Sequence, residues 1–219
     1  MPDRRAVLLA AAGCLLLPGF AYARIPATAG IGWQDFLDRI SGLAGSRLDD
    51  GLPDQVVGET GLRLMQQLDT GSADFGHAIE DAWESGNRFW LWQRLARTQT
   101  LLGGVLQIDK DNDVPLHDHP GATGMLRVLS GSMEVWQFDR IDAHHGTRDN
   151  ACLLKRTEHR ILHPGDTAML LPEHGNIHAL RANSAQCSML DFFIPPYQRK
   201  LRSWYQPLEH DWTEIGQIT

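Results

Sequence analysis

Apolar residues between Trp33 and about Ser85 recur at the spacing of amphipathic helices. Glycine and proline, which end helices, divide this part of the chain near residues 45, 51–53 and 71. The pattern predicts three short helices whose aromatic residues pack in a core. The apolar positions are Phe36, Ile40 and Leu43, then Val56, Val57, Leu62, Leu64 and Met65, then Phe75, Ala78, Ile79 and Trp83.

After about Arg97 the chain changes to short apolar runs separated by Gly, Pro, Asn and Asp, a texture typical of strands and turns. A set of short strands at this spacing indicates a β-sandwich or barrel. We therefore expect a mainly β protein behind a helical N-terminal layer, with a polar loop at 140–150. The candidate strands are 98–108, 114–119, 124–129, 133–138, 152–162, 167–171, 177–181 and 187–194.

The first 23 residues have the composition of an export signal. Arg4 and Arg5 precede an apolar run over 6–17, and Ala21-Tyr22-Ala23 has the form of a cleavage site. This run is too short for a membrane span, which needs about 20 residues. Residues 3–8 also look like a twin-arginine signal, although a general secretory signal or a lipoprotein site at Cys14 is an alternative. The prediction is a cleaved signal and a periplasmic or otherwise extracytoplasmic protein.

The remaining chain divides into a helical layer over 24–95 and a barrel over 96–219, which we expect to form one structural domain. The composition, 42% hydrophobic and 21% charged, is that of a globular protein. Lys and Arg number 20 against 27 Asp and Glu, for a net charge of -7, and they form no basic stripe. We therefore expect a monomer whose partners are small molecules or peptides rather than nucleic acid or a membrane.

The three cysteines contain no C-x-x-C pair, so they do not indicate a structural zinc site. Cys152 and Cys187 lie in candidate strands about 35 residues apart. In an oxidising compartment they could form a disulfide, and elsewhere they would be two buried thiols. The sequence leaves both possibilities open.

Ten histidines are the unusual chemical resource of this chain. His117 and His119 flank Asp118 at the end of a candidate strand, where alternate side chains share a face. Both imidazoles would then point into the barrel while Asp118 points away. A third nitrogen ligand from the strand that begins near 177 would complete a facial site with open positions, the arrangement of a catalytic metal.

His178 and His174 both flank Gly175-Asn176 and compete for the place of this third ligand. We favour His178 because it lies on the strand, whereas a loop residue is more easily solvated. The other histidines have patterns that do not suit one metal ion. His144 and His145 lie in the polar loop, and His159 and His163 are too widely spaced.

Three separated motifs then make the family recognisable: VPLHDHPGATGMLRVLSG at 114–131, GNIH at 175–178 and LDFFIPPY at 190–197. Together with the Gly165-Asp166 turn they resemble the cupin superfamily, and within it the cysteamine dioxygenase and plant cysteine oxidase family of thiol dioxygenases. The resemblance implies a cupin-type β-barrel, or double-stranded β-helix. It also implies a non-haem Fe(II) enzyme that uses O2 to oxidise the thiol of a small aminothiol or a Cys-initiated peptide to a sulfinic acid.

The resemblance also assigns roles to single residues. A typical cupin has a Glu ligand where this chain has Gly124, so the expected ligands are three neutral histidines, and such a site favours an incoming thiolate. Asp191 matches the family's acid behind the ligands, and we expect it to accept the ring N–H of His178. Tyr197 matches the family's active-site tyrosine, placed to donate a hydrogen bond over the metal.

Two features depart from the family. Animal cysteamine dioxygenases have a Cys near a C-terminal Tyr, whereas this chain has Ser203-Trp204-Tyr205, so we expect no Cys–Tyr crosslink. The export signal is also unusual for an intracellular family. Two other functions therefore stay open: a cupin dioxygenase or isomerase that acts on a carbon substrate with another divalent metal, and a non-catalytic periplasmic cupin that binds a metal or ligand.

Overall fold

The computed structural model describes residues 30–85, 88–89, 91–110, 112–141, 152–197 and 199–207. The side chains of 88, 89 and 199 are not among the described atoms. The predicted export signal at 1–23 lies outside the described residues. So does most of the predicted polar loop at 140–150, including His144 and His145.

Three helices form the N-terminal layer, as the apolar spacing predicts: α1 (Trp33–Asp49), α2 (Asp54–Gln67) and α3 (Ala73–Glu84). Each buries one face and exposes the other. The buried face of α1 carries Phe36 and Ile40, both fully buried, and that of α3 carries Phe75. None of the helices within the described residues is long and apolar enough to cross a membrane.

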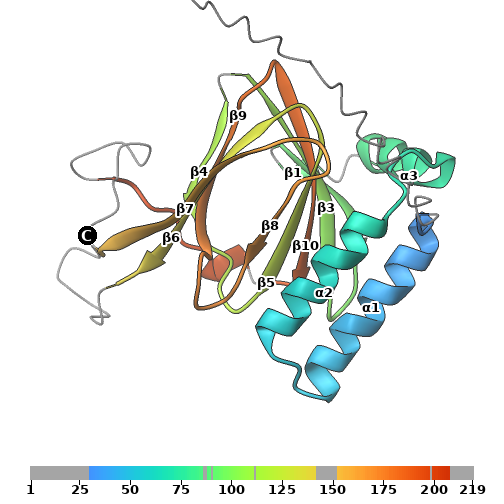
Figure 1. The fold of residues 1–219 in the computed structure, drawn as a ribbon, viewed down its shortest axis with the longest axis horizontal. Helices are drawn as coiled ribbons and strands as arrows, with labels where there is room; N and C mark the ends of the chain where they lie inside the picture. Colours follow the sequence, from blue (N-terminus) through green and yellow to red (C-terminus); the bar gives the residue numbers. More distant parts are fainter. Residues whose placement is uncertain are drawn as a thin grey trace, which may run out of the picture.

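In the described part of the chain, ten strands form two antiparallel sheets that face each other as a barrel (Figure 1). The six-stranded sheet has the order β1-β2-β3-β10-β5-β8, and the four-stranded sheet has the order β4-β9-β6-β7. This architecture confirms the cupin-type barrel. The strands are β1 (Arg88–Phe89), β2 (Trp92–Arg97), β3 (Leu102–Asp109), β4 (Asp113–His117), β5 (Thr123–Ser130), β6 (Met133–Arg140), β7 (Leu154–Leu162), β8 (Thr167–Leu170), β9 (Ile177–Ala182) and β10 (Gln186–Ile194). A short 3-10 turn, η1 (Arg199–Leu201), follows them.

The sequence pattern misses β1 and β2, and the predicted boundary at residue 95 falls inside β2. The pairing of β2 with β3 shifts register between Arg94 and Ala96, so the alternation of inward and outward side chains is interrupted there. Without that alternation, the apolar residues of β2 do not show a strand period. The predicted strand at 98–108 begins instead at Leu102.

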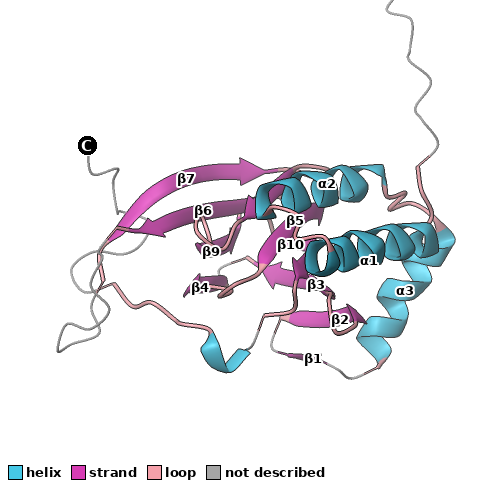
Figure 2. Cartoon of the chain, turned by 90° about the horizontal axis from the view of Figure 1, so that it is seen from below, coloured by secondary structure: helices cyan, strands magenta, loops and turns pink. Residues whose placement is uncertain are grey.

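Two of the three apolar clusters among the described residues hold the layers together. One fills the barrel between its sheets, and the other joins α1, α2 and α3 to the outer face of the six-stranded sheet. Figure 2 shows α1 and α2 over β5 and β10, with α3 beside β1 and β2. Glycines allow this close approach: a Cβ added at Gly61 of α2 would lie 2.0 Å from the Sδ of Met125 on β5. The helices therefore brace the sheet that carries Asp191.

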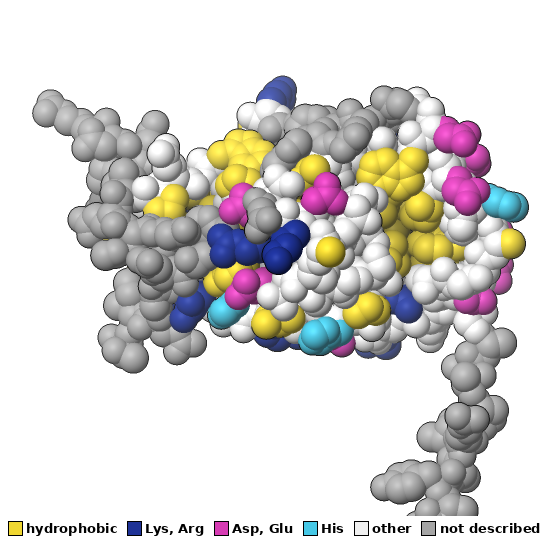
Figure 3. Space-filling model, turned by 90° about the horizontal axis from the view of Figure 1, so that it is seen from above, with side chains coloured by type: hydrophobic (Ala, Val, Ile, Leu, Met, Phe, Trp, Pro, Cys, Tyr) yellow, Lys and Arg dark blue, Asp and Glu magenta, His cyan; other side chains and the backbone are white. Residues whose placement is uncertain are grey.

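On the face shown in Figure 3, Lys and Arg side chains lie among acidic, apolar and neutral ones. The side chains that can carry metal chemistry lie inside the barrel, between β4, β9 and β10.

Candidate metal centre

Three histidines converge inside the barrel: His117, His119 and His178. All three are buried, and their candidate ligand atoms lie within 4.8 Å of one another. His117 lies opposite His178 in the antiparallel pair of β4 and β9, and the Nε2 atoms of His117 and His119 are 3.1 Å apart. The structure therefore brings together the three residues that the sequence predicts as ligands.

Backbone carbonyls orient two of these rings. The Nδ1 of His117 lies 2.8 Å from the carbonyl oxygen of Pro115, and the Nδ1 of His178 lies 2.8 Å from that of Asn176. Because a carbonyl only accepts, each Nδ1 carries the ring proton, and each Nε2 is left with a lone pair for a metal. A backbone oxygen thus fixes the tautomer that a metal ligand needs.

Burial also keeps the three rings neutral. It lowers the pKa of His117 and of His119 well below the ordinary value, with further lowering from the neighbouring histidines. Burial lowers the pKa of His178 to about 4. Neutral imidazole is the form that binds a metal, so at neutral pH the centre requires no deprotonation before binding.

Asn176, rather than a strand ladder, positions His119. We expected His119 to lie in a strand, but β4 ends at His117. The backbone N–H of His119 instead donates to Oδ1 of Asn176 at 2.6 Å, and Nδ2 of Asn176 donates back to the His119 carbonyl at 3.2 Å. Asn176 is itself buried, so this exchange fixes the second ligand against the strand of the third.

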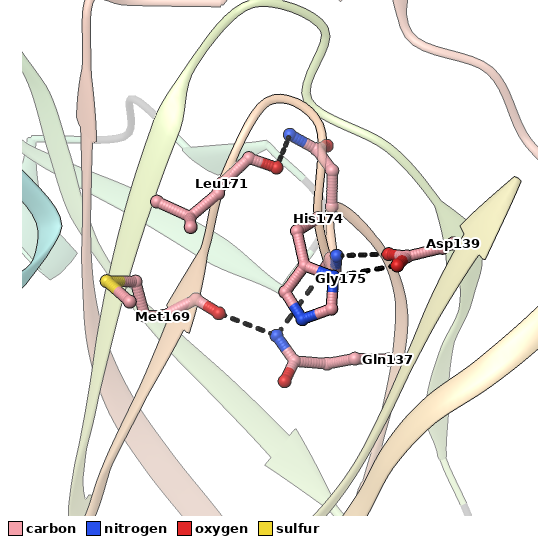
Figure 4. Close-up of polar contacts among 7 residues, drawn as sticks. Gln137, Asp139, Met169, Leu171, His174 and Gly175 are labelled. Atoms are coloured by element: carbon pink, nitrogen blue, oxygen red, sulfur yellow. Dashed lines mark hydrogen bonds and ion pairs between the residues drawn. The ribbon is translucent and has the colours of Figure 1, made fainter. Parts of the chain in front are cut away.

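His174 lies outside the centre, which agrees with the preference for His178 as the third candidate ligand. Its side chain is 64% exposed, and its Nδ1 lies 2.7 Å from a carboxylate oxygen of Asp139 (Figure 4). The other oxygen of Asp139 accepts the backbone N–H of Gly175 at 2.6 Å, and Gln137 donates to the Gly175 carbonyl. These contacts hold the turn that leads into Asn176 and His178.

Two further histidines, His159 and His163, take no part in the centre. The Nε2 of His159 lies 2.7 Å from a carboxylate oxygen of Glu134, and its ring stacks on Trp136. His163 is exposed at a turn. Neither is among the described groups of His, Cys, Asp and Glu that could hold a metal.

The cavity beside the three histidines is small, about 50 Å³. Gly124, where a typical cupin has a Glu ligand, is closely surrounded by side chains. A Cβ there would lie 2.9 Å from Leu170 and 3.0 Å from Phe193. The candidate donor set among the described residues is therefore three histidine nitrogens. The cavity lining also includes Asp191, Tyr197, Arg202 and Trp204.

Asp191 is buried on β10, but its partner is not the one we predicted. Its Oδ1 accepts the indole N–H of Trp92 at 2.7 Å, whereas the ring N–H of His178 is directed to a backbone carbonyl. The expectation that Asp191 orients His178 is therefore wrong, because the backbone of β9 already supplies that acceptor. Burial raises the pKa of Asp191 to about 7, although the Trp92 hydrogen bond and the charge of Arg202 oppose the rise.

Tyr197 lies over the centre. Its ring packs edge-on against His119, with centroids 4.2 Å apart, and its hydroxyl oxygen accepts a hydrogen bond from Arg202. Since a guanidinium only donates, the hydroxyl proton of Tyr197 is directed to a different group. Tyr197 thus lines the cavity beside His119.

The segment after Tyr197 crosses the mouth of the cavity. Trp204 stacks on His117, with centroids 5.0 Å apart. Asp118, which points away from the two neighbouring ligands as predicted, accepts hydrogen bonds from the backbone N–H of Ser203 at 2.7 Å and the hydroxyl of Tyr205 at 2.9 Å. We call residues 199–207 the C-terminal strap. Asp118 anchors this strap across the ligands.

No disulfide joins Cys152 and Cys187. Cys187 is fully buried in the barrel core, where burial raises the pKa of its thiol to about 11. The structure therefore favours the thiol alternative.

Sequence reasoning missed four residues of the site: Trp92, Asn176, Arg202 and Trp204. Asn176 carried a signal, since it stands two residues before His178 in the GNIH motif. Trp92 lies on the missed strand β2, and the strap residues follow the last predicted strand with no periodic pattern. Their positions depend on tertiary contacts that residue spacing does not encode.

The class of this protein is therefore a cupin-type barrel with a candidate metal centre of three buried histidines. The chain belongs to the PCO_ADO family, whose model matches residues 84–210. This match confirms the resemblance seen in the three motifs.

The curated relatives have names that describe enzymes oxidising a thiol compound. The chain is 31% identical over 114 residues to 2-aminoethanethiol dioxygenase of Homo sapiens, a match that covers 43% of this chain and 42% of that protein. It is 33% identical over 86 residues to plant cysteine oxidase 2 of Arabidopsis thaliana, covering 38% and 31% of the two chains. The chain thus spans less than half the length of these relatives.

A solved double-stranded β-helix protein from Klebsiella pneumoniae is similar with a TM-score of 0.39 and 15% identity. That match covers 53% of this chain and 84% of the other.

Proposed function

We propose that the protein is a non-haem Fe(II) thiol dioxygenase. It would convert the thiol of a small aminothiol, or of an N-terminal cysteine, to the sulfinic acid by adding both atoms of O2 to sulfur. The observation that carries this proposal is the convergence of three buried, neutral histidines on a small cavity without a carboxylate ligand. Family membership and the names of the relatives support it.

The residues of the centre fit a divalent iron ion. His117, His119 and His178 would hold it, because neutral imidazole nitrogens are suitable ligands for iron and three of them on one side leave positions for substrate. Iron bound there would supply adjacent positions for a thiolate and O2, which brings the reactants together and favours loss of the thiol proton. Position 124 is a glycine and supplies no carboxylate, so iron bound there would keep more of its positive charge toward a thiolate.

The remaining side chains of the cavity would control protons and water. Tyr197 would donate its hydroxyl proton to an oxygen or sulfur atom of the reactants, since its oxygen already accepts from Arg202. Asp191, held by Trp92, would bind the amine of an aminothiol or accept a proton in the cavity. Trp204 of the strap would limit the access of bulk water to His117.

The test is O2 uptake by iron-loaded protein on a thiol panel, with metal content measured in parallel. We expect uptake with thiols, and loss of both iron and activity in His178→Ala. The matched control is His174→Ala, which removes a neighbouring exposed histidine and should keep both. Iron near wild type in the His178 variant would contradict the assignment. Absence of O2 uptake would favour a metal-binding cupin, and uptake with carbon substrates alone would favour another cupin chemistry.

We also propose that the protein works outside the cytoplasm, by twin-arginine export. Sites rich in histidine bind copper and zinc more tightly than Fe(II), so loading with iron before export would avoid these competitors. The variant Arg4→Lys with Arg5→Lys preserves the charge of the signal. It should leave iron-loaded precursor in the cytoplasm, detected by fractionation and metal analysis, and normal export of this variant would overturn the proposal.

A further inference from the structure

The C-terminal strap pairs with β4, an edge strand of the four-stranded sheet. Two backbone hydrogen bonds, of 2.9 and 3.3 Å, join residues 203–205 to residues 116–118. They lie on either side of the antiparallel pair formed by His117 and Trp204. In a pair flanked in this way the two side chains lie on one face and approach each other closely. The backbone of the strap therefore directs Trp204 onto the ring of His117.

Trp204 forms the wall of the cavity that faces solvent. Its ring stacks on the His117 ring at an interplanar angle of 28°, and the residue is 50% exposed. Among the described residues that line the cavity, Trp204 alone is exposed. Trp92, Tyr197 and Arg202 are half-buried, and the other lining residues are buried. The indole thus lies between the histidines and the solvent.

The space behind this wall is small. The cavity has a volume of about 50 Å³, and a single water molecule needs at least about 10–15 Å³. It therefore takes a ligand of a few non-hydrogen atoms, the size of cysteamine. The opposite walls are buried residues of the barrel core, such as Leu106, Leu126 and Phe193. A longer ligand would have to extend past Trp204 into solvent and displace its ring.

We propose that Trp204 determines substrate size: it admits a small aminothiol and excludes a Cys-initiated peptide. The ring is held in place, because Asp118 accepts hydrogen bonds from both neighbours of Trp204 in the strap. The guanidinium of Arg202 also lies 5.4 Å from the centroid of the Trp204 ring. Residues that follow an N-terminal cysteine would meet this fixed ring. The inference rests on the proposed thiol dioxygenase function and narrows its substrate.

The test compares cysteamine with the dipeptide Cys-Gly and the tetrapeptide Cys-Gly-Gly-Gly, using iron-loaded protein. We expect the kcat/KM of the wild type to fall as the substrate lengthens. Trp204→Ala should raise kcat/KM for the tetrapeptide, relative to that for cysteamine, at least about 10-fold, the lower end of what a misfit in an apolar pocket costs. Trp204→Phe keeps a smaller ring and should be intermediate. Leu201→Ala is the matched control, because Leu201 is exposed on the same strap and does not line the cavity.

The ratio of two substrates within one variant is independent of its iron content, so a general loss of structure does not change it. Anaerobic calorimetry with the tetrapeptide adds a measurement without turnover, and it should show tighter binding to Trp204→Ala than to wild type by a similar factor. An unchanged ratio in Trp204→Ala, or a wild type that oxidises the tetrapeptide as efficiently as cysteamine, would overturn the role of Trp204 and leave the dioxygenase intact. No oxidation of any thiol by the wild type would overturn the proposed function itself, and with it this inference.

Discussion

Asn176 shows how single side chains assemble the centre at the scale of the residue. Its Oδ1 accepts from the backbone of His119, and its Nδ2 donates to the carbonyls of His119, Ala122 and Leu171 at 3.2 to 3.4 Å. Its own carbonyl lies against the ring nitrogen of His178. Asn176 therefore links His119 to His178, through its side-chain amide on one side and its backbone carbonyl on the other.

Removing this amide should loosen the centre. In Asn176→Ala the backbone N–H of His119 loses its acceptor, and an unsatisfied buried group costs about 1–3 kcal/mol. We expect a free energy of unfolding lower by about that amount. We also expect roughly 10 to 100-fold weaker metal binding, as is typical for partners that orient ligands. Denaturant titration and metal competition measure the two effects. Asn183→Ala, at an exposed position, is the control, and equal effects in both variants would contradict the role of Asn176.

Asp191 makes stability depend on pH. Burial raises its pKa from 3.8 to about 7, so the folded protein binds a proton more tightly than the unfolded chain. Its contribution is favourable below pH 4 and is lost as the pH rises through 7. The buried histidines, whose pKa values are lowered, give the opposite slope, with stability gained as the pH rises through their range.

The variant Asp191→Asn isolates this effect, because Asn keeps an oxygen for Trp92 and does not titrate. Metal-free wild type should lose stability relative to the variant between pH 4 and 7.5. We expect urea unfolding at several pH values to show that, as the pH rises, the free energy of unfolding of wild type falls relative to that of Asp191→Asn. A difference in free energy of unfolding that does not change with pH would show that the pKa of Asp191 is not raised by folding.

At the residue scale, the sequence predicted which three histidines come together, but it missed the groups that support them. The H-x-H spacing and the histidine at the start of a strand indicate His117, His119 and His178, although β4 ends at His117 and Asn176 positions His119. Trp92 and Arg202 were not identified, since they reach the cavity through a bulged strand and a non-periodic strap. The partner of Asp191 was mistaken for the same reason: spacing does not encode which donor is nearest.

At the scale of the element, α2 is fitted to the barrel by two glycines. Cβ atoms added at Gly58 and Gly61 would lie 2.2 and 2.0 Å from the sulfur atoms of Met169 and Met125. The helix backbone thus lies directly on β5 and β8. Arg127 of β5 also donates to the carbonyls of Met65 and Leu68 at the end of α2, which fixes the helix along the sheet.

A methyl group added at this contact and one added at an open position of another helix give a matched pair of variants. Gly61→Ala should destabilise the fold by about 1–3 kcal/mol, the usual effect of overpacking a core. Gly42→Ala on α1, where nothing lies within 4 Å of the added Cβ, should stabilise it by about 0.5–1 kcal/mol through helix propensity. Urea titration checks both values. Stabilisation by Gly61→Ala would show that α2 does not pack closely on the barrel.

Element types were easier to predict than element limits. Helical and strand periods differ strongly, so α1, α2, α3 and most strands of the barrel follow from the apolar pattern. The register shift in β2 hides its period, and β4 ends at His117 because a side chain of Asn176 takes over the bonding of His119.

At the scale of the whole molecule, the barrel brings together residues that lie far apart in the chain. β4 and β9 pair His117 with His178, β10 carries Asp191, and the strap returns Arg202 and Trp204 to the same cavity. The helices cover the outer face of the six-stranded sheet and leave the interior to the centre (Figure 1). The fold therefore places a small, largely apolar cavity beside three neutral histidines, which suits the proposed oxidation of a small thiol.

Isotope labelling of the product tests the central claim most directly. Anaerobic protein loaded with Fe(II) is mixed with cysteine and then exposed to ¹⁸O2, and the product is analysed by mass spectrometry. The account predicts cysteine sulfinic acid in which both sulfinate oxygens carry the label, and no such product with His178→Ala. A product with one labelled oxygen or none, or conversion of cysteine to the disulfide alone, would contradict a thiol dioxygenase.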